Sequence, residues 1–137
     1  IAQCLVGSEM CIRDSIYDYD GSVYVSDEAR MMARFKNYFF RLGNVNENSY
    51  QEMFNGELLH NIISSACTEC LPVCSECVFQ PYCGADPVRN MSEQGDMIGF
   101  RPTNEMCKKT KSIIHYLFEL LHKHDPEINR IFWSWLN

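Results

Sequence analysis

The sequence has no excess of basic residues, no long apolar run and too little length for a large enzyme barrel. Lys and Arg number 12 against 18 Asp and Glu, so the formal net charge is -6. That balance argues against non-specific nucleic-acid binding, which needs a basic face. No apolar run approaches the roughly 18 residues of a membrane span, and 137 residues fall well short of the roughly 250 of a (β/α)8 barrel. We therefore expect one small domain whose partners include neither nucleic acid nor a membrane.

Cysteine, in contrast, is plentiful. Eight of the 137 residues are cysteines, a larger share than an ordinary cytosolic domain carries. The chain is 46% hydrophobic and 12% aromatic, which is enough apolar material for a core and argues against wholesale disorder. The function of this domain therefore depends on what its cysteines hold.

The first 15 residues are unlike the rest of the chain. The sequence begins with Ile1 rather than Met, and the string CLVGSEMCIRDS at residues 4–15 resembles the translated adapter read-through found at the ends of metagenomic reading frames. We therefore expect residues 1–15 to be a non-native leader, with Cys4 and Cys11 as accidental residues and the real reading frame beginning near Ile16. The alternative is a genuine N-terminal arm that carries two ligand cysteines.

The remaining residues predict an α+β fold with an N-terminal β-hairpin, short helices, a cysteine-rich loop and C-terminal helices. Asp20-Gly21 lies between alternating residues and predicts a hairpin with a type I′ turn, in which both central residues have positive φ. Ser49 and Glu52 form a capping box, which predicts a helix from Tyr50. Further predicted elements are a helix over 27–35 capped by Ser26, an extended stretch over 39–45, a break near Gly56 with a helix resuming over 58–66, a long helix to about His124 capped by Thr103 or Asn104, and a last helix beginning at Asp125-Pro126.

Residues 67–102 show no regular pattern. The part from Cys67 to Cys83 is dense in Cys and Pro, which predicts a loop. Residues 86–102 contain Gly95, Gly99 and Pro102, which predict a second irregular segment. A structureless stretch of about 35 residues is unusual in a compact domain unless something else orders it. A metal centre would do so, because ligand binding contributes folding free energy directly.

Two of the three kinds of centre that compete for the cysteines are a disulfide scaffold and structural zinc. A disulfide scaffold needs an oxidising compartment, which nothing in the chain indicates, and two close C-x2-C pairs favour a metal. A zinc ribbon separates its knuckles by about 12–20 residues, whereas three residues separate the pairs here. Zinc remains chemically possible at Cys74, Cys77, Cys83 and Cys107.

The third kind of centre is an iron–sulfur cubane. It needs four thiolates around a larger object, so its ligands come from one tight loop and one distant cysteine. The loop would be the C-x2-C-x5-C string from Cys74 to Cys83. The distant ligand would be Cys107 at the start of the predicted long helix, whose N-terminus favours a thiolate.

Cys70, Cys74 and Cys77 also match the C-x3-C-x2-C motif of radical S-adenosylmethionine (SAM) enzymes. In that motif three cysteines leave one iron open for the amino and carboxylate groups of the cofactor. The motif belongs after the first strand of a partial barrel, but only 60 residues follow Cys77. Glu76 also stands where the motif favours an aromatic residue. We interpret this match as a coincidence.

The string CSECVFQPYCGADP, followed by QGDMIGFRPTNEMC, resembles the SPASM domain, the C-terminal auxiliary-cluster domain of peptide-modifying radical SAM enzymes. The strings YDYDGSVYVSDEARMM, FRLGNV and PYCGADPV are similar in particular to the radical SAM maturases of His-Xaa-Ser peptide systems. The resemblance covers about Ile16 to Leu121. It implies a small irregular cluster-binding domain over residues 16–121 and a helical tail over residues 122–137.

The resemblance implies one auxiliary [4Fe-4S] cluster with four thiolate ligands, which are Cys74, Cys77, Cys83 and Cys107. A SPASM domain normally holds a second auxiliary cluster, but Ser26 and Pro87 stand at two of its ligand positions. This departure puts the second cluster in doubt. Cys67 and Cys70 are then either substitute metal ligands or buried thiols beside the cluster.

The resemblance also implies the chemistry of the parent enzyme. An N-terminal barrel with its own cluster cleaves S-adenosylmethionine, and the resulting radical takes a hydrogen from a precursor peptide. The auxiliary cluster relays an electron, positions the peptide or holds the domain together. We expect the barrel of the same protein and the peptide as partners, the bacterial cytoplasm as the compartment, and no catalytic residue or activity in this chain alone. The alternative is a zinc-stabilised interaction module without a redox role.

Overall fold

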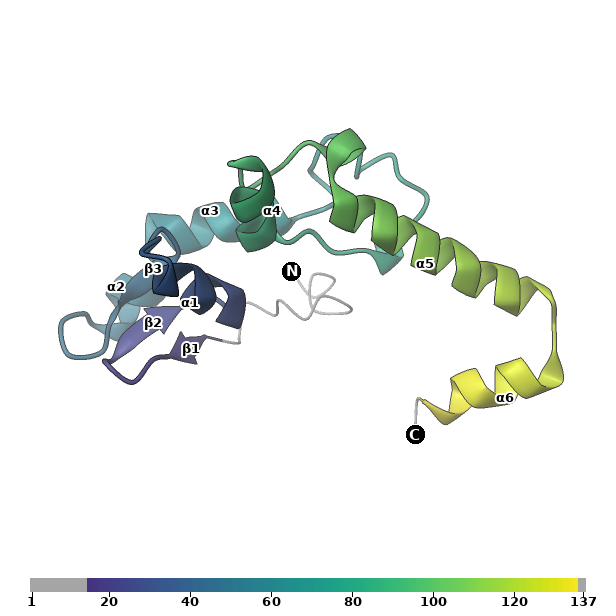
Figure 1. Ribbon diagram of the computed structural model, residues 1–137, viewed down its shortest axis with the longest axis horizontal. Coiled ribbons are helices and arrows are strands. Elements are labelled where there is room, and N and C mark those ends of the chain that lie inside the picture. The colour runs from purple at the N-terminus through teal and green to yellow at the C-terminus, as the bar shows by residue number, and fades with distance from the viewer. Residues whose placement is uncertain (1–14, 136–137) are drawn as a thin grey trace. The chain divides into compact units, whose positions relative to one another are not determined.

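The computed structural model describes residues 15–135, and the contacts divide the chain into two units, one up to Arg101 and one from Pro102 onward. The elements of both units are labelled in Figure 1. The expected leader, with Cys4 and Cys11, lies outside the described residues except for its last residue. The domain bounds expected from the sequence, 16–121 and 122–137, stay predictions.

A small antiparallel sheet forms one part of the first unit. Tyr17 pairs with Val23, and Val23 pairs on its other side with Gly43. The second strand along the chain therefore lies in the middle of the sheet. Together with the helices, this sheet confirms the mixed α+β class. The three strands, in spatial order, are β1 (Ile16–Tyr17), β2 (Ser22–Tyr24) and β3 (Arg41–Asn44).

The hairpin between β1 and β2 is present, but its turn differs from the predicted one. The Gly21 N–H donates to the Asp18 carbonyl at 3.0 Å, and the Asp18 N–H donates to the Ser22 carbonyl at 2.8 Å. Of the central pair Asp20-Gly21, only Gly21 has positive φ, at 83°. The predicted type I′ turn is therefore wrong. The connection is a three-residue loop that ends in a left-handed residue, a geometry in which glycine is favoured at the last position.

Side-chain caps begin two of the next three helices where the sequence predicts. The Ser26 Oγ accepts a hydrogen bond from the Ala29 N–H at 3.2 Å. The Ser49 Oγ accepts from the Glu52 N–H at 3.3 Å while the Glu52 carboxylate accepts from the Ser49 N–H at 2.7 Å, which completes the capping box. Such caps depend on neighbouring residues only, which makes them predictable from sequence. The helices are α1 (Asp27–Arg34), α2 (Tyr50–Phe54) and α3 (Glu57–Ala66).

The core of the first unit joins the sheet to three helices. Phe40 and Val88 are each 1% exposed, and Ile62 is 2% exposed. Fully burying one such side chain contributes about 1.5–3 kcal/mol. These three residues share one cluster with Tyr24, Ala29 and Ala33.

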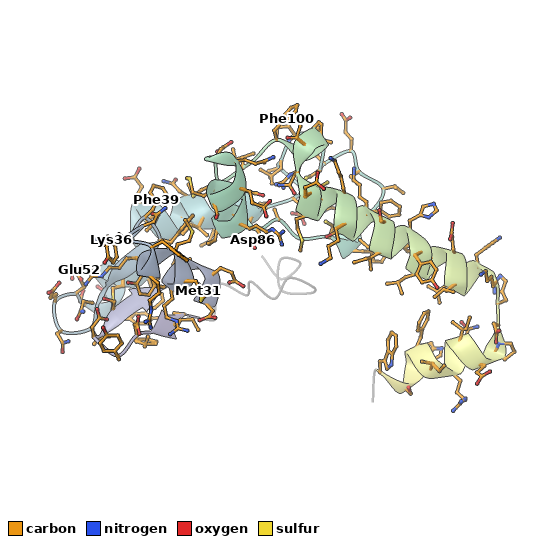
Figure 2. All side chains as sticks on the ribbon, viewed as in Figure 1. Met31, Lys36, Phe39, Glu52, Asp86 and Phe100 are labelled. Atoms are coloured by element: carbon orange, nitrogen blue, oxygen red, sulfur yellow. The ribbon has the colours of Figure 1, made fainter. Side chains whose placement is uncertain are left out.

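Residues 87–94 form a helix, α4 (Pro87–Gln94), where the sequence predicts irregular chain, so that prediction is wrong for this part of residues 86–102. Asp86 caps the helix by accepting from the Arg89 N–H at 2.9 Å, and Figure 2 marks it at the beginning of α4. Gly95 ends the helix in the left-handed conformation, at φ 74°. An Asp cap, Pro at the first position and a terminal Gly are helix signals. The prediction gave more weight to the glycines and to the later proline.

Asp86 gives α4 a pH-dependent contribution to stability. Burial raises the pKa of this carboxyl and the negative charge of Glu28 raises it further, while the hydrogen bond from the Arg89 N–H lowers it; the pKa lies above its ordinary value of 3.8. A group whose folded-state pKa is raised stabilises the fold fully below the unfolded pKa and loses that effect as the pH rises through the folded pKa. We expect Asp86→Asn to raise the free energy of unfolding at pH 7, because Asn keeps the cap without the buried charge.

Urea unfolding between pH 3 and pH 7 measures this effect. The advantage of Asp86→Asn should disappear as the pH falls below about 3.8, where the wild-type carboxyl is also neutral. Asp86→Ala is the control, because it removes the charge and the cap together, and at pH 7 it should be about 1 kcal/mol less stable than Asp86→Asn. If Asp86→Asn is less stable than the wild type at pH 7, the buried charge stabilises the helix and the assignment is wrong.

The second unit consists of two capped helices, as the sequence predicts. The Asn104 Oδ1 accepts from the Cys107 N–H at 2.8 Å, and the Asp125 Oδ1 accepts from the Glu127 N–H at 2.8 Å. Within residues 15–135, none of the helices combines the length and the apolar character that crossing a membrane requires. The two helices are α5 (Glu105–His122) and α6 (Pro126–Ser134).

Candidate metal centre

The cysteine-rich segment is a loop between two packed helices, α3 and α4 (Figure 1). It leaves α3 at Cys67 and ends where Pro87 begins α4. Ile62 of α3 and Val88 of α4 both lie in the core of the first unit. One core therefore fixes both ends of the loop, which limits the volume that its thiols can explore.

Backbone turns order the loop locally. The Cys70 N–H donates to the Cys67 carbonyl at 3.0 Å, and the Cys77 N–H donates to the Cys74 carbonyl at 3.0 Å. Each C-x2-C pair therefore closes one backbone turn. The Cys77 carbonyl also accepts from the Gln80 N–H at 2.9 Å, where a short 3₁₀ helix, η2 (Gln80–Tyr82), begins.

One side-chain hydrogen bond and two buried residues hold the loop away from a fully extended path. The Gln80 Nε2 donates to the Thr68 Oγ1 at 3.1 Å and so links the last part of the loop to its first part. Thr68 and Leu71 are both buried. The side chains of the loop therefore order part of it without a metal ion. A bound ion would stabilise a loop that is already partly ordered.

The Cys67 and Cys70 sulfurs lie 3.6 Å apart. Two sulfurs that each lie about 2.3 Å from one tetrahedral zinc ion are about 3.8 Å apart, so this spacing matches one edge of a tetrahedral thiolate site. In a cubane, each thiolate binds a different iron, and neighbouring ligands stand farther apart. The geometry of this pair therefore suits a single metal ion better than two corners of a cubane.

Cys67 does not have the character of a redox-catalytic thiol. Its hydrogen bond with Cys70, and after that its bond to the Glu69 carboxylate at 3.3 Å, raise the pKa of Cys67 to about 11. The residue also follows the C-terminal end of α3, where the helix dipole disfavours a thiolate. Catalytic C-x2-C pairs have a lowered pKa at a helix N-terminus. This pair therefore does not resemble the active site of a thiol–disulfide oxidoreductase.

The structure places the four predicted cluster ligands on two elements. Cys74, Cys77 and Cys83 lie on the loop of the first unit, and Cys107 lies in the first turn of α5 in the second unit. All four are half-buried thiols, so each is accessible to an incoming ion. In the part of the chain that the structure describes, no three His, Cys, Asp or Glu side chains are gathered closely enough to hold a metal ion.

Two positions at which the resemblance would have further cluster ligands hold other residues, Ser26 and Pro87. Ser26 caps α1, and Pro87 occupies the first position of α4 with almost no exposed surface. Both residues therefore have a structural role at a helix start instead of a sulfur ligand.

The donor set fits a thiolate-bound metal centre. Cysteine thiolates are the preferred ligands of iron–sulfur clusters and of structural zinc. Closing such a site requires the ligands to deprotonate and to draw together, and metal binding supplies the free energy for both. The four predicted ligands would hold a cluster, and Cys67 with Cys70 would hold two positions of a single ion.

Arg101 is a residue of interest that the sequence analysis missed. It begins a short 3₁₀ helix, η3 (Arg101–Thr103), and is 8% exposed. Its Nε and Nη2 atoms are buried and have no hydrogen-bond partner among the described residues. An arginine between Phe100 and Pro102 predicts an exposed loop residue, so no local signal indicates this burial.

Comparison with family models, curated proteins and solved structures gives no match to the chain. Its functional assignment therefore depends on the cysteine pattern and on the geometry of the loop.

Proposed function

We propose that the chain is the C-terminal auxiliary [4Fe-4S] domain of a radical SAM enzyme that modifies a ribosomal precursor peptide of the His-Xaa-Ser type. The observation that carries the proposal is the loop between α3 and α4, which presents the C-x2-C-x5-C thiols from one fixed segment. Cys107, capped into the first turn of α5, completes the ligand set. In this proposal, S-adenosylmethionine and its own cluster belong to an N-terminal barrel of the same protein.

The local structure supports this ligand assignment in two ways. The turn that Cys74 and Cys77 close is followed by η2 before Cys83, so consecutive local turns order the ten residues that carry these three thiols. Cys107 lies near the N-terminus of an 18-residue helix, where the partial positive charge of the helix favours a thiolate. Each ligand thus has a physical reason for its position.

The ligand count limits what the centre can do. When bound, the cluster supplies one-electron transfer. Four cysteine ligands occupy all four irons, so no iron is open to bind the peptide directly. The thiolates of this chain would hold the cluster in place. An electron-transfer or structural role therefore fits better than a substrate-binding role.

Anaerobic reconstitution of the full chain with iron and sulfide tests the proposal. We expect a brown protein with broad visible absorbance that dithionite bleaches, because the reduced cluster absorbs less. A variant with both Cys74→Ser and Cys77→Ser is the matched control and should remain colourless while keeping the helical circular dichroism of the wild type. A wild-type chain that stays colourless would contradict the proposal.

A zinc-stabilised interaction module is the second candidate. The 3.6 Å separation of the Cys67 and Cys70 sulfurs favours it, because that distance matches one edge of a tetrahedral site. In this case Cys67→Ala and Cys70→Ala would each release the metal and lower the melting temperature. Under the cluster proposal, the same two variants keep their iron.

A further inference from the structure

The thiols of Cys67 and Cys70 form a close pair that the proposed cluster does not use. Their sulfurs lie 3.6 Å apart, and both residues belong to the first unit. Cys70 is exposed and Cys67 is half-buried, so small reagents in solution reach the pair. Two thiols in contact at an accessible site are the starting arrangement for a disulfide.

The backbone of the pair has the geometry that a disulfide requires. The Cys70 N–H donates to the Cys67 carbonyl at 3.0 Å, and a four-residue turn of this kind brings its first and last Cα atoms within about 7 Å. The Cα atoms of a disulfide lie no farther apart than this. The two sulfurs need to approach from 3.6 Å to about 2.05 Å, which side-chain rotation can supply while the turn stays closed.

Neighbouring contacts hold this turn in the reduced chain. Thr68 and Leu71 are both buried, and the Gln80 Nε2 donates to the Thr68 Oγ1 at 3.1 Å. The turn also follows directly from α3, which Ile62 fixes in the core. Because the fold already holds the sulfurs close together, little conformational entropy is left to lose when the bond forms.

We propose that Cys67 and Cys70 are a reversible oxidation site, which a low-molecular-weight disulfide such as oxidised glutathione converts to an intrachain disulfide. This role goes beyond the proposed cluster and does not require it. In a reducing compartment, disulfides are typically transient or redox-sensing. The pair is here the target of oxidation and not a catalyst that oxidises other proteins.

The reaction consists of two thiol–disulfide exchange steps. The Glu69 carboxylate lies 3.3 Å from the Cys67 sulfur and disfavours negative charge there, so the exposed Cys70 attacks first. Its sulfur loses a proton to water and bonds to one sulfur of the small disulfide, whose other sulfur leaves as a thiolate and takes up a proton. The Cys67 sulfur then loses its proton, bonds to the Cys70 sulfur and expels the second small thiolate, which is protonated in turn. Two protein thiols are oxidised, and one small disulfide is reduced to two thiols.

Closing the disulfide changes what the loop binds. The thiolate is the form of cysteine that binds a metal, so oxidation removes Cys67 and Cys70 as competing ligands. The thiols that remain on the loop are those of Cys74, Cys77 and Cys83, which are the three loop ligands of the proposed cluster.

Thiol labelling of the full chain tests the proposal. The chain is purified anaerobically in the reduced state, exposed to oxidised glutathione and blocked with iodoacetamide. Cleavage after Glu69 separates Cys67 from Cys70, so the disulfide appears in mass spectrometry as two joined peptides. We expect joined peptides from the wild type, their loss after treatment with dithiothreitol, and their absence from Cys70→Ser.

Cys74→Ser is the matched control. Cys74 and Cys70 lie on the same peptide after cleavage at Glu69 and Glu76, so the joined peptides of the wild type alone do not distinguish the two. We expect Cys74→Ser to keep the joined peptides. Their loss from Cys74→Ser would assign the partner of Cys67 to Cys74 and overturn the proposal.

Three results from the wild type would also overturn the proposal. If Cys67 and Cys70 both stay labelled in excess oxidised glutathione, the pair does not close. If the reaction stops at a mixed disulfide between glutathione and Cys70, Cys67 does not complete the second step. If the purified chain holds one zinc ion and forms the disulfide only after a chelator removes the ion, the pair is a zinc site.

Discussion

Replacing Cys77 with serine is expected to abolish the cluster, with iron after reconstitution falling from about four atoms per chain to almost none. A cubane needs one thiolate at each iron, and a serine hydroxyl is a much weaker ligand. Cys77 closes the turn that begins at Cys74, so no neighbouring sulfur takes its place without breaking that turn. Because Cys77 is half-buried and outside the core, the metal-free fold should be unaffected.

Cys67→Ser and Cys70→Ser are the matched controls for this experiment. They make the same chemical change in the same loop, at the pair whose 3.6 Å separation suits a single ion. Iron and sulfide analysis of all three variants, beside circular dichroism of the metal-free forms, gives the comparison. Equal loss of iron from Cys67→Ser or Cys70→Ser would show that the ligand assignment is wrong.

Phe40→Ala is expected to cost about 3–5 kcal/mol in the free energy of unfolding. Phe40 is 1% exposed and is the largest fully buried side chain of the cluster that joins the sheet to α1, α3 and α4. Its removal leaves a cavity that the backbone cannot fill. Since domains of this size are stable by only about 5–15 kcal/mol in total, the variant should be partly unfolded at moderate temperature.

Phe39→Ala is the control for this loss. The Phe39 ring lies edge-on to the Phe40 ring at a centroid distance of 5.0 Å, but Phe39 is 47% exposed and is marked in Figure 2. We expect Phe39→Ala to lower the free energy of unfolding by no more than about 1.5 kcal/mol. That is the upper value for the interaction between two aromatic rings, counted separately from the burial of their surface. Urea unfolding of the metal-free proteins measures both. Losses of equal size would contradict the assignment of Phe40, and not Phe39, to the core.

Helix starts were the most predictable part of the fold, because each depends on a hydrogen bond over two or three residues. Ser26, Ser49, Asn104 and Asp125 all cap helices as their sequence context predicts. The break before α3 also follows from a local glycine. Such signals need no knowledge of the tertiary structure.

Other features depend on contacts that sequence spacing does not encode. The helix α4 has its own start and stop signals, but Val88 in the core stabilises it, and that packing partner is not visible in a glycine-rich string. The hairpin turn was mispredicted because Asp20-Gly21 is compatible with two loop lengths. The burial of Arg101 depends on tertiary packing, and no local sequence pattern predicts it.

The spacing of the cysteines predicts a metal centre and its loop ligands, and that chemistry stays a prediction. The local geometry of the loop could not be predicted from the sequence. The turns at Cys67–Cys70 and Cys74–Cys77, and the bond from Gln80 to Thr68 that links the two ends of the loop, emerge only from the structure. A thiolate site also forms fully only when its ion binds, because the ion offsets the cost of gathering negative charges.

The most direct test of the assignment is the metal and sulfide content of the full chain purified under anaerobic conditions. If Cys74, Cys77, Cys83 and Cys107 hold a cubane, analysis should find about four irons and about four acid-labile sulfides per chain. One tightly held zinc per chain, without sulfide, would contradict the cluster and assign the loop to a structural zinc site.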